Sequence, residues 1–465
     1  MINLLLFVMT ISMIGFSVLS FIKINSYYGI TSLSFPVGAS VITLYCWGLS
    51  IFEVDYSFTV IYVPLIVGSL LLIIVNRYIL KNNFFYKIKK SVLFRNKREI
   101  FLYIFVLFIV LVEFIAILSH SISVKVYQPD EYSQWAFQAK VIFEGKSLES
   151  FYGGNGFETG FERYPSFIPL IAACFYIFSN DIVDSFVRVI GPIFLGSLSI
   201  FIYSIIVKIV KSHLIAILMV GIFLTSGFVV FEISSGLYAD IAFSYFYTIS
   251  AVFLLYHLVN KKVRSLLCSA LFLGIASWVK TDGQYLIIIH LFILLVHMFL
   301  EYRSIKLIRN VKNVLIYLGG ASIIPLTWNA YTNISNFPVS RWSFSPHFEF
   351  VFSMISSSIE QIMNTTNWGM FWPLCLCMLV INLYLGFRKY QIYVLAIILA
   401  NIAFLYLSYI FMFGMEAQTA ASFSRYILRV APLSLIYVAL IIKELKNTRA
   451  LRGSGNEGTS NSPGL

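Results

Sequence analysis

Apolar stretches of about 17–25 residues recur along this chain of 465 residues and constrain its fold more than any other feature. A helix of that length crosses the roughly 30 Å hydrocarbon core of a bilayer. Because lipid offers the backbone no hydrogen-bond partners, such stretches must be helices rather than open strands. Hydrophobic residues make up 59% of the chain and charged residues 12%, which excludes a soluble globular protein. The sequence therefore predicts an all-α polytopic membrane protein.

The formal net charge of +12 does not indicate nucleic-acid binding, because many of the basic residues are concentrated in short segments between apolar runs. They cluster at 81–99, 260–264 and 302–312. This is the positive-inside pattern of membrane proteins, which places these loops in the cytoplasm. Residues 1–22 lack a basic leader and a small-residue cleavage site, so they are expected to be a retained first helix.

Counting from the basic loops predicts about thirteen transmembrane helices, with the N-terminus outside and the C-terminus inside. The expected spans are 2–22, 34–52, 58–77, 101–119, 185–207, 213–233, 239–258, 265–280, 283–300, 313–330, 368–387, 391–413 and 427–444. The run 164–179 is short and contains two prolines, and charge parity requires that it does not cross. It is therefore predicted to be a helix lying on or dipping into the outer leaflet.

Four regions follow from this topology. Residues 1–100 form an N-terminal three-helix membrane segment with a basic cytoplasmic loop, and 101–330 form a membrane core with the external loop 120–184. Residues 331–445 form C-terminal helices with a second external loop, 331–367. The Gly/Ser/Asn-rich tail 446–465 is expected to be disordered and cytoplasmic.

The adjacent acids Asp130 and Glu131 open the external segment QPDEYSQWAFQAKVIFEG. From Glu131 to Glu144, apolar residues recur at helical spacing, which predicts an amphipathic helix lying in the membrane interface on the external side. An acid at a helix start is favoured by the helix dipole, so a plain helix cap is the structural alternative. Between two membrane segments, however, an acid pair can also take a proton or hold a polar substrate.

Further polar residues fall at the same predicted external boundary. Asp240 begins an apolar, aromatic span, where an acid is costly unless it faces a polar cavity or a partner; the alternative is an interfacial cap. Lys280 and Asp282 in SWVKTDGQYL break two spans, and Lys280 is a candidate for binding a lipid-linked phosphate or for simple snorkelling. Arg425 in FSRYILRVAPL opens the last span, where Arg429 lies one turn deeper, and both suit phosphate or a structural ion pair.

His347 lies in the external loop 331–367 beside Arg341, and a lone loop histidine usually has no special role. Neither HExxH, nor a P-loop, nor GxSxG, nor a Cys/His metal pattern occurs. All five cysteines lie in apolar segments and are expected to be small core residues. No cofactor is predicted; a divalent cation is compatible with the site but not indicated.

The order of these motifs resembles the GT-C superfamily of integral-membrane glycosyltransferases, in the bacterial branch related to protein O-mannosyltransferases and the lipid A aminoarabinose transferase. The motifs are DEYSQWAFQAKVIFEG, RYPSFIPLIAACFYIF, GLYADIAFSYF, WVKTDGQYL and SRYILRVAPL. The resemblance covers roughly residues 100–300 and 425–432. The chain departs from the family in having three preceding spans, no DxD in the first loop and no C-terminal soluble domain.

The resemblance implies transfer of a sugar from a polyprenyl-phosphate carrier to a glycan, lipid or protein acceptor, outside the bacterial cytoplasmic (inner) membrane, in cell-envelope polysaccharide biosynthesis. It implies that Asp130 is the general base, with Glu131 positioning it or the acceptor. Asp240 would orient the sugar or a cation, while Lys280 and Arg425 would offset charge on the leaving phosphate. Tyr164, in the Tyr-Pro helix, joins Asp282 and His347 among the expected substrate- or phosphate-binding residues.

Two other functions remain open at the level of sequence. An O-antigen-type polymerase or ligase would also use a lipid-linked donor, but would depend on Arg341 and His347 rather than on the early acid pair. A lipid-linked oligosaccharide flippase or other transporter would have charged residues spread along mid-membrane helices and inverted repeats.

Overall fold

The computed structural model of the chain describes residues 1–22, 26–80, 94, 96–152, 164–301, 307–335, 337, 348, 351–413 and 416–455. Within these ranges every regular element is a helix and no strand occurs. The predicted all-α class is therefore confirmed for the part of the chain that the structure describes.

Nine helices of the described part are long and apolar enough to cross a membrane, which fits a multi-pass integral membrane protein. They are α1 (Ile2–Phe21), α2 (Tyr27–Ile51), α3 (Phe58–Ile74) with η1 (Val75–Ile79), α4 (Lys97–Ser123), α8 (Asp184–Val187) with α9 (Ile190–Val210), α12 (Ala239–Asn260), α14 (Asp282–Glu301), α15 (Leu307–Ile334), and α19 (Lys389–Ser408) with η4 (Tyr409–Phe413).

The predicted total of thirteen spans is not confirmed. Three of the expected spans are shorter apolar helices, namely α10 (His213–Leu224), α13 (Val263–Val279) and α18 (Phe371–Leu385). The last, α21 (Ala431–Gly455), is not among the nine. It continues as helix through Gly455, so the first part of the tail predicted to be disordered is helical; residues 456–465 lie outside the described residues.

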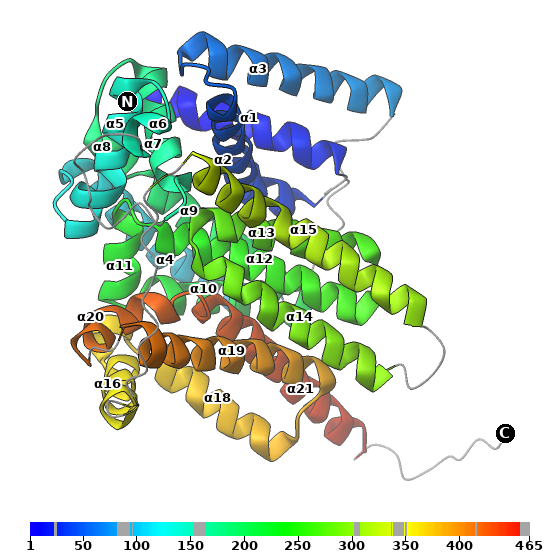
Figure 1. The fold of residues 1–465 in the computed structure, drawn as a ribbon. Helices are drawn as coiled ribbons and strands as arrows, with labels where there is room; N and C mark the ends of the chain where they lie inside the picture. The colour runs from blue at the N-terminus through cyan, green and yellow to red at the C-terminus, as the bar shows by residue number, and fades with distance from the viewer. Residues whose placement is uncertain are drawn as a thin grey trace.

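Helix α12 lies near the centre of the molecule (Figure 1), and its burial contrasts with that of α4. In the most apolar window of each helix, 83% of α12 is buried within the protein but only 11% of α4. Helix α12 packs against α13, and α13 packs in turn against α15. The apolar face of α4 is consequently available to lipid, whereas most of α12 is surrounded by protein.

The N-terminal helices join this core rather than forming a separate unit. Gly15 of α1 and Gly38 of α2 bring the two backbones together, since a Cβ on Gly15 would collide with the carbonyl oxygen of Ser34. Small residues permit this close approach of membrane helices. Helix α2 then packs on α9, and the Tyr245 hydroxyl of α12 donates to the Ser32 carbonyl of α2.

The segment predicted as one span over 213–233 is broken in the structure. Helix α10 ends at Leu224 and α11 (Phe228–Ser235) begins after Gly227, whose φ of +77° interrupts the helix. The Gly221 carbonyl accepts both the backbone N–H of Thr225, at 2.9 Å, and its hydroxyl, at 2.8 Å, and these bonds close the last turn of α10. A single span was predicted because the segment is mostly apolar on both sides of Gly227. The helix does not continue through the backbone conformation of that glycine.

The segment between α4 and α8 contains η2 (Glu131–Trp135), α5 (Ala136–Gly145), α6 (Glu149–Tyr152) and α7 (Phe167–Ser179). The predicted amphipathic helix is present, and its apolar side, including Trp135, Ala139 and Ile142, is buried. Helix α5 packs against α7, and α7 also contacts α1 and α2. Residues 167–177 are all buried in protein, so α7 is a short core helix rather than one lying in the leaflet.

The remaining helices lie at one side of the C-terminal half, where α16 (Val351–Met363) packs against α20 (Glu416–Ile427) and α17 (Thr365–Trp368) (Figure 1). Helix α20 leads through residues 428–430 into α21. Arg425 in its last turn contacts Asp240 at the beginning of α12, and Arg429, which follows α20, contacts Asp282 at the beginning of α14.

Candidate functional site

Helix ends from distant parts of the sequence meet at one end of α12. Asp240 lies in the first turn of α12, Lys280 directly follows α13, and Asp282 begins α14. Arg425 lies in the last turn of α20, and Asp130 directly precedes η2. Alternation of helix direction brings the start of α12, the end of α13 and the start of α14 to the same level, so these residues can interact.

Four of these side chains form a continuous chain of ion pairs. Arg425 donates from Nη1 to Oδ2 of Asp130 at 2.6 Å and from Nη2 to Oδ2 of Asp240 at 3.0 Å. Lys280 donates from Nζ to the other carboxylate oxygen of Asp240, Oδ1, at 2.8 Å. Two carboxylates thus balance two cations, with Arg425 as the bridge.

Burial is graded along this chain. The side chains of Asp240 and Lys280 are only 6% and 7% exposed, whereas those of Asp130 and Arg425 are 35% and 31% exposed. Removing Asp240 would leave Lys280 buried without its paired carboxylate, which is strongly destabilising. The Asp130 carboxylate, at the other end, remains accessible to a ligand or to a proton.

Aromatic rings surround the two cations. The Lys280 Nζ lies 4.5 Å from the centroid of the Tyr426 ring, and the Arg425 Cζ lies 4.7 Å from that of Tyr238, both within the range of cation–π interaction. Burial alone would lower the pKa of Arg425, but the Asp240 and Asp130 carboxylates outweigh that effect and raise it above its usual value. Arg425 is therefore a permanent cation at the boundary between the buried and exposed parts of the site.

This geometry decides between the alternatives for three residues. The Asp130 side chain makes no capping hydrogen bond to η2, because it is directed to Arg425. The Asp240 side chain is bound by Lys280 and Arg425 rather than by the backbone at the start of α12. Lys280 is buried and paired instead of snorkelling to the membrane surface.

Asp282 joins the site through Arg429, whose Nη1 lies 3.1 Å from its Oδ2. The Arg429 side chain is 4% exposed, and among the described residues its Nη2 has no hydrogen-bond partner. A buried guanidinium with a free N–H can donate a hydrogen bond to a further oxygen ligand. Arg425 and Arg429, one turn apart, thus present two guanidinium groups beside Asp240 and Asp282.

Glu131 faces the opposite way from Asp130 and is fully buried. Its Oε1 accepts from Nε of Arg188 at 3.0 Å and from the backbone N–H of Leu237 at 2.6 Å. Its Oε2 accepts from the backbone N–H of Tyr127 and Gln128 at 3.4 and 3.3 Å. The two adjacent acids therefore have different environments: one carboxylate is accessible, and the other is saturated with internal donors.

Arg188, which connects α8 to α9, is a site residue that the sequence reasoning missed. Besides Glu131, it binds the Val124 carbonyl from Nη1 at 2.6 Å, and its side chain is 1% exposed. The available signal was an arginine within the apolar run 185–207, since an ionisable residue there requires a partner.

The other predicted site residues are not part of the ion-pair chain or cannot be placed. Tyr164 is half-buried, its ring centroid lies 5.8 Å from that of Trp135, and its carbonyl accepts from the Tyr152 hydroxyl. His347 lies outside the described residues, as does Arg341. Within the described ranges, no group of three or more His, Cys, Asp or Glu side chains is placed to hold a metal ion.

Comparison with known proteins gives one finding at the level of structure. No protein-family model and no curated protein matches the sequence. Among solved structures, the chain is similar to ArnT from Cupriavidus metallidurans, whose crystal structure is bound to undecaprenyl phosphate. The sequences are 13% identical and the TM-score is 0.48, over 76% of this chain and 63% of ArnT. The chain therefore matches less than two thirds of the length of that protein.

Proposed function

We propose that this protein is a membrane glycosyltransferase that moves a sugar from a polyprenyl-phosphate-linked donor to an acceptor at the external face of the cytoplasmic membrane. The proposal depends chiefly on one observation: the accessible Asp130 carboxylate is hydrogen-bonded to Arg425, which also binds the buried Asp240–Lys280 pair. A base, two cations and a fixed counter-charge thus lie together beside apolar helices that suit a lipid carrier.

Asp130 is the proposed general base. Of the two carboxylates in the chain of ion pairs, that of Asp130 is the more accessible. It can therefore receive a proton from an acceptor hydroxyl as that oxygen attacks the anomeric carbon. The new carbon–oxygen bond forms while the bond from the anomeric carbon to the phosphate oxygen breaks. The polyprenyl phosphate leaves with the bonding electrons, and the proton remains on Asp130.

Arg425 and Lys280 are the proposed stabilisers of the negative charge that develops on the leaving phosphate. Arg425 can offer its guanidinium to two phosphate oxygens, and Lys280 acts as a point charge. The free N–H of Arg429, with Asp282 fixing its other end, is a third donor on the same side. Asp240 holds Lys280 and Arg425 in place, and it can orient the sugar when a substrate displaces one of them.

Glu131 is assigned a positioning role, because internal donors already occupy both of its carboxylate oxygens. Through Leu237 it fixes the loop that carries Tyr238 into α12. Asp130 is its sequence neighbour, so the Glu131–Arg188 pair sets the distance between the base and the rest of the site.

The test is a transfer assay on the purified protein in liposomes, with a panel of polyprenyl-phosphate sugars and an extract of cell-envelope glycans as acceptors. We expect product with wild type and none with Asp130→Asn, although the variant remains folded by gel filtration. Normal product from Asp130→Asn would contradict the proposal. If, instead, activity is lost only in Arg341→Ala or His347→Ala, the polymerase or ligase alternative takes its place.

A further inference from the structure

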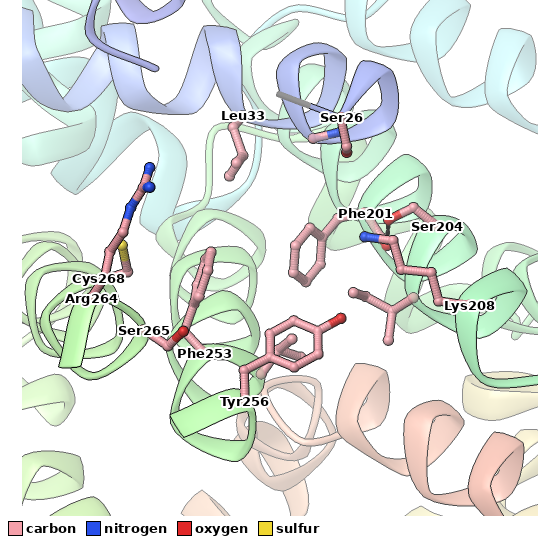
Figure 2. A pocket seen from close by; sticks show the side chains of 13 residues that line it. Ser26, Leu33, Phe201, Ser204, Lys208, Phe253, Tyr256, Arg264, Ser265 and Cys268 are labelled. Carbon is pink, nitrogen blue, oxygen red and sulfur yellow. Dashed lines mark hydrogen bonds between the residues drawn. The ribbon is translucent and has the colours of Figure 1, made fainter. Parts of the chain in front are cut away.

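A cavity lies at the opposite end of the helices that carry the candidate site. It has a volume of about 250 Å³ and lies between α2, α9, α12 and α13 (Figure 2). Tyr256 is sixteen residues beyond Asp240 on α12, and Arg264 is sixteen residues before Lys280 on α13. At 1.5 Å per residue, both helices place the cavity ~24 Å from the site. That separation is close to the thickness of a bilayer core, so the two lie in opposite leaflets.

The cavity combines two cations with several hydroxyl groups. Lys208 near the end of α9 and Arg264 in the first turn of α13 both line it, together with the hydroxyls of Ser26, Ser265 and Tyr256. Among the described residues, neither Lys208 nor Arg264 forms an ion pair. Both cations are therefore available to an external anion, unlike Lys280 and Arg425 at the other end.

The wall between the cations is apolar. Figure 2 shows Lys208 and Arg264 on different sides of the cavity, with the rings of Phe201 and Phe253 between them and Leu33 above. A free phosphate would gain nothing from these rings, whereas an acyl chain would bury apolar surface against them. The cavity therefore fits a molecule with an anionic head and an apolar tail.

We propose that this cavity binds the headgroup of an anionic phospholipid of the inner leaflet. The phosphate would bind one of the two cations, the rest of the headgroup would meet the other cation and the hydroxyls, and one acyl chain would extend along Phe201 and Phe253. Basic pockets between membrane helices at the cytoplasmic side are suited to anionic headgroups. The exposed lysines that follow α12, Lys261 and Lys262, mark this end as the basic, cytoplasmic one.

The test measures lipid retention by native mass spectrometry. Wild type is reconstituted in nanodiscs that contain phosphatidylglycerol and phosphatidylcholine in equal parts, released in mild detergent, and analysed for bound lipid. We expect phosphatidylglycerol to be retained roughly 10- to 30-fold over phosphatidylcholine, and Lys208→Gln with Arg264→Gln to abolish this preference. Arg264→Gln alone should give an intermediate preference.

The matched control is Lys261→Gln with Lys262→Gln, which removes the same charge from the same end of the helices but not from the cavity lining. It should retain the wild-type preference. Equal loss in the control, or equal retention of the two lipids by wild type, would overturn the proposal. Displacement of phosphatidylglycerol by added inorganic phosphate would also overturn it, because it would assign the cavity to the free anion.

Discussion

The Nε atom of Arg188 lies 3.0 Å from Oε1 of Glu131, with both side chains buried, and the same oxygen accepts the backbone N–H of Leu237. This contact joins the segment that carries Asp130 to the loop that leads into Asp240. Burying an ion pair is costly, so its advantage is the specific arrangement that it imposes. The position of the proposed base relative to the second acid thus depends on a pair that does not itself face the substrate.

Asp130→Asn should reduce turnover by about 10²–10⁴-fold, the contribution typical of a general base, with little change in stability because the side chain is about a third exposed. Steady-state transfer kinetics and thermal unfolding measure the two effects. Glu144→Gln removes an exposed carboxylate from the same segment and should leave both unchanged. Retention of more than a tenth of the activity in Asp130→Asn would exclude its role as base.

Glu131→Gln, although it changes the residue next to Asp130, should mainly reduce the stability of the protein. It leaves the buried Arg188 without a counter-charge, which costs about 3–5 kcal/mol of stability. Replacing both Glu131 and Arg188 by leucine should recover part of this loss while activity stays low, because the loop at Leu237 is released. Thermal unfolding of Glu131→Leu, Arg188→Leu and the double variant gives the coupling, and simple additivity would show that the pair does not act as a unit.

Asp240→Asn should be among the most destabilising changes at the site, since it leaves the buried Lys280 without its paired carboxylate and removes one of the two carboxylates that Arg425 binds. We expect a loss of about 3–5 kcal/mol in the free energy of unfolding. The double variant Asp240→Asn with Lys280→Met should regain a substantial part of this stability. The double variant should remain inactive because it lacks the cation that faces the phosphate. A double variant no more stable than Asp240→Asn would argue against the pairing seen here.

Arg425→Lys keeps the charge but cannot bridge Asp130 and Asp240 with a planar fork. We expect the kcat of Arg425→Lys to fall about 10–100-fold and that of Arg425→Gln to fall further. Transfer kinetics with the lipid donor as the varied substrate measure kcat and kcat/KM for both variants. Arg388→Lys provides a comparison, because Arg388 pairs with Glu444 at an exposed position outside the site. Equal activity of the lysine and glutamine variants at 425 would show that charge at this position is not used.

Gly236→Ala tests the same region through the backbone. A Cβ at Gly236 would lie 2.8 Å from Oε1 of Glu131 and 2.9 Å from atoms of the Tyr238 ring. Relieving that overlap requires a shift of the loop or of the buried carboxylate, at about 1–3 kcal/mol. Gly48→Ala, where a Cβ would meet nothing within 4 Å, is the control and should be neutral in thermal unfolding.

Much of the fold was predictable because it depends on short stretches of sequence. Apolar length gave helices that lie within a few residues of α1, α4, α12 and α14, and helical spacing gave the buried face of α5. The errors arose where composition and geometry differ. Gly227 breaks a run that is mostly apolar on both sides of it, and α7 is apolar because protein rather than lipid surrounds it.

The candidate residues were predictable for a similar reason, but their roles were not. Asp130, Asp240, Lys280 and Arg425 were selected because each is a charge at the end of an apolar run, which is a property of the adjacent residues alone. Arg188 carried the same signal within its run and was not selected. Only the family resemblance gave Glu131 and Asp130 different roles, since two neighbours in a sequence have nearly the same local surroundings.

The sequence by itself determined that the chain forms apolar helices and that its unusual charges lie at helix ends, because hydrophobicity and helical period act over a few turns. The tertiary structure alone decided the partners. Arg425 meets Asp130 and Asp240 across 295 and 185 residues, and Arg188 meets Glu131 across 57. Contacts at such separations follow from how helices pack and in which direction each residue faces. That packing made one carboxylate of an adjacent pair accessible and enclosed the other.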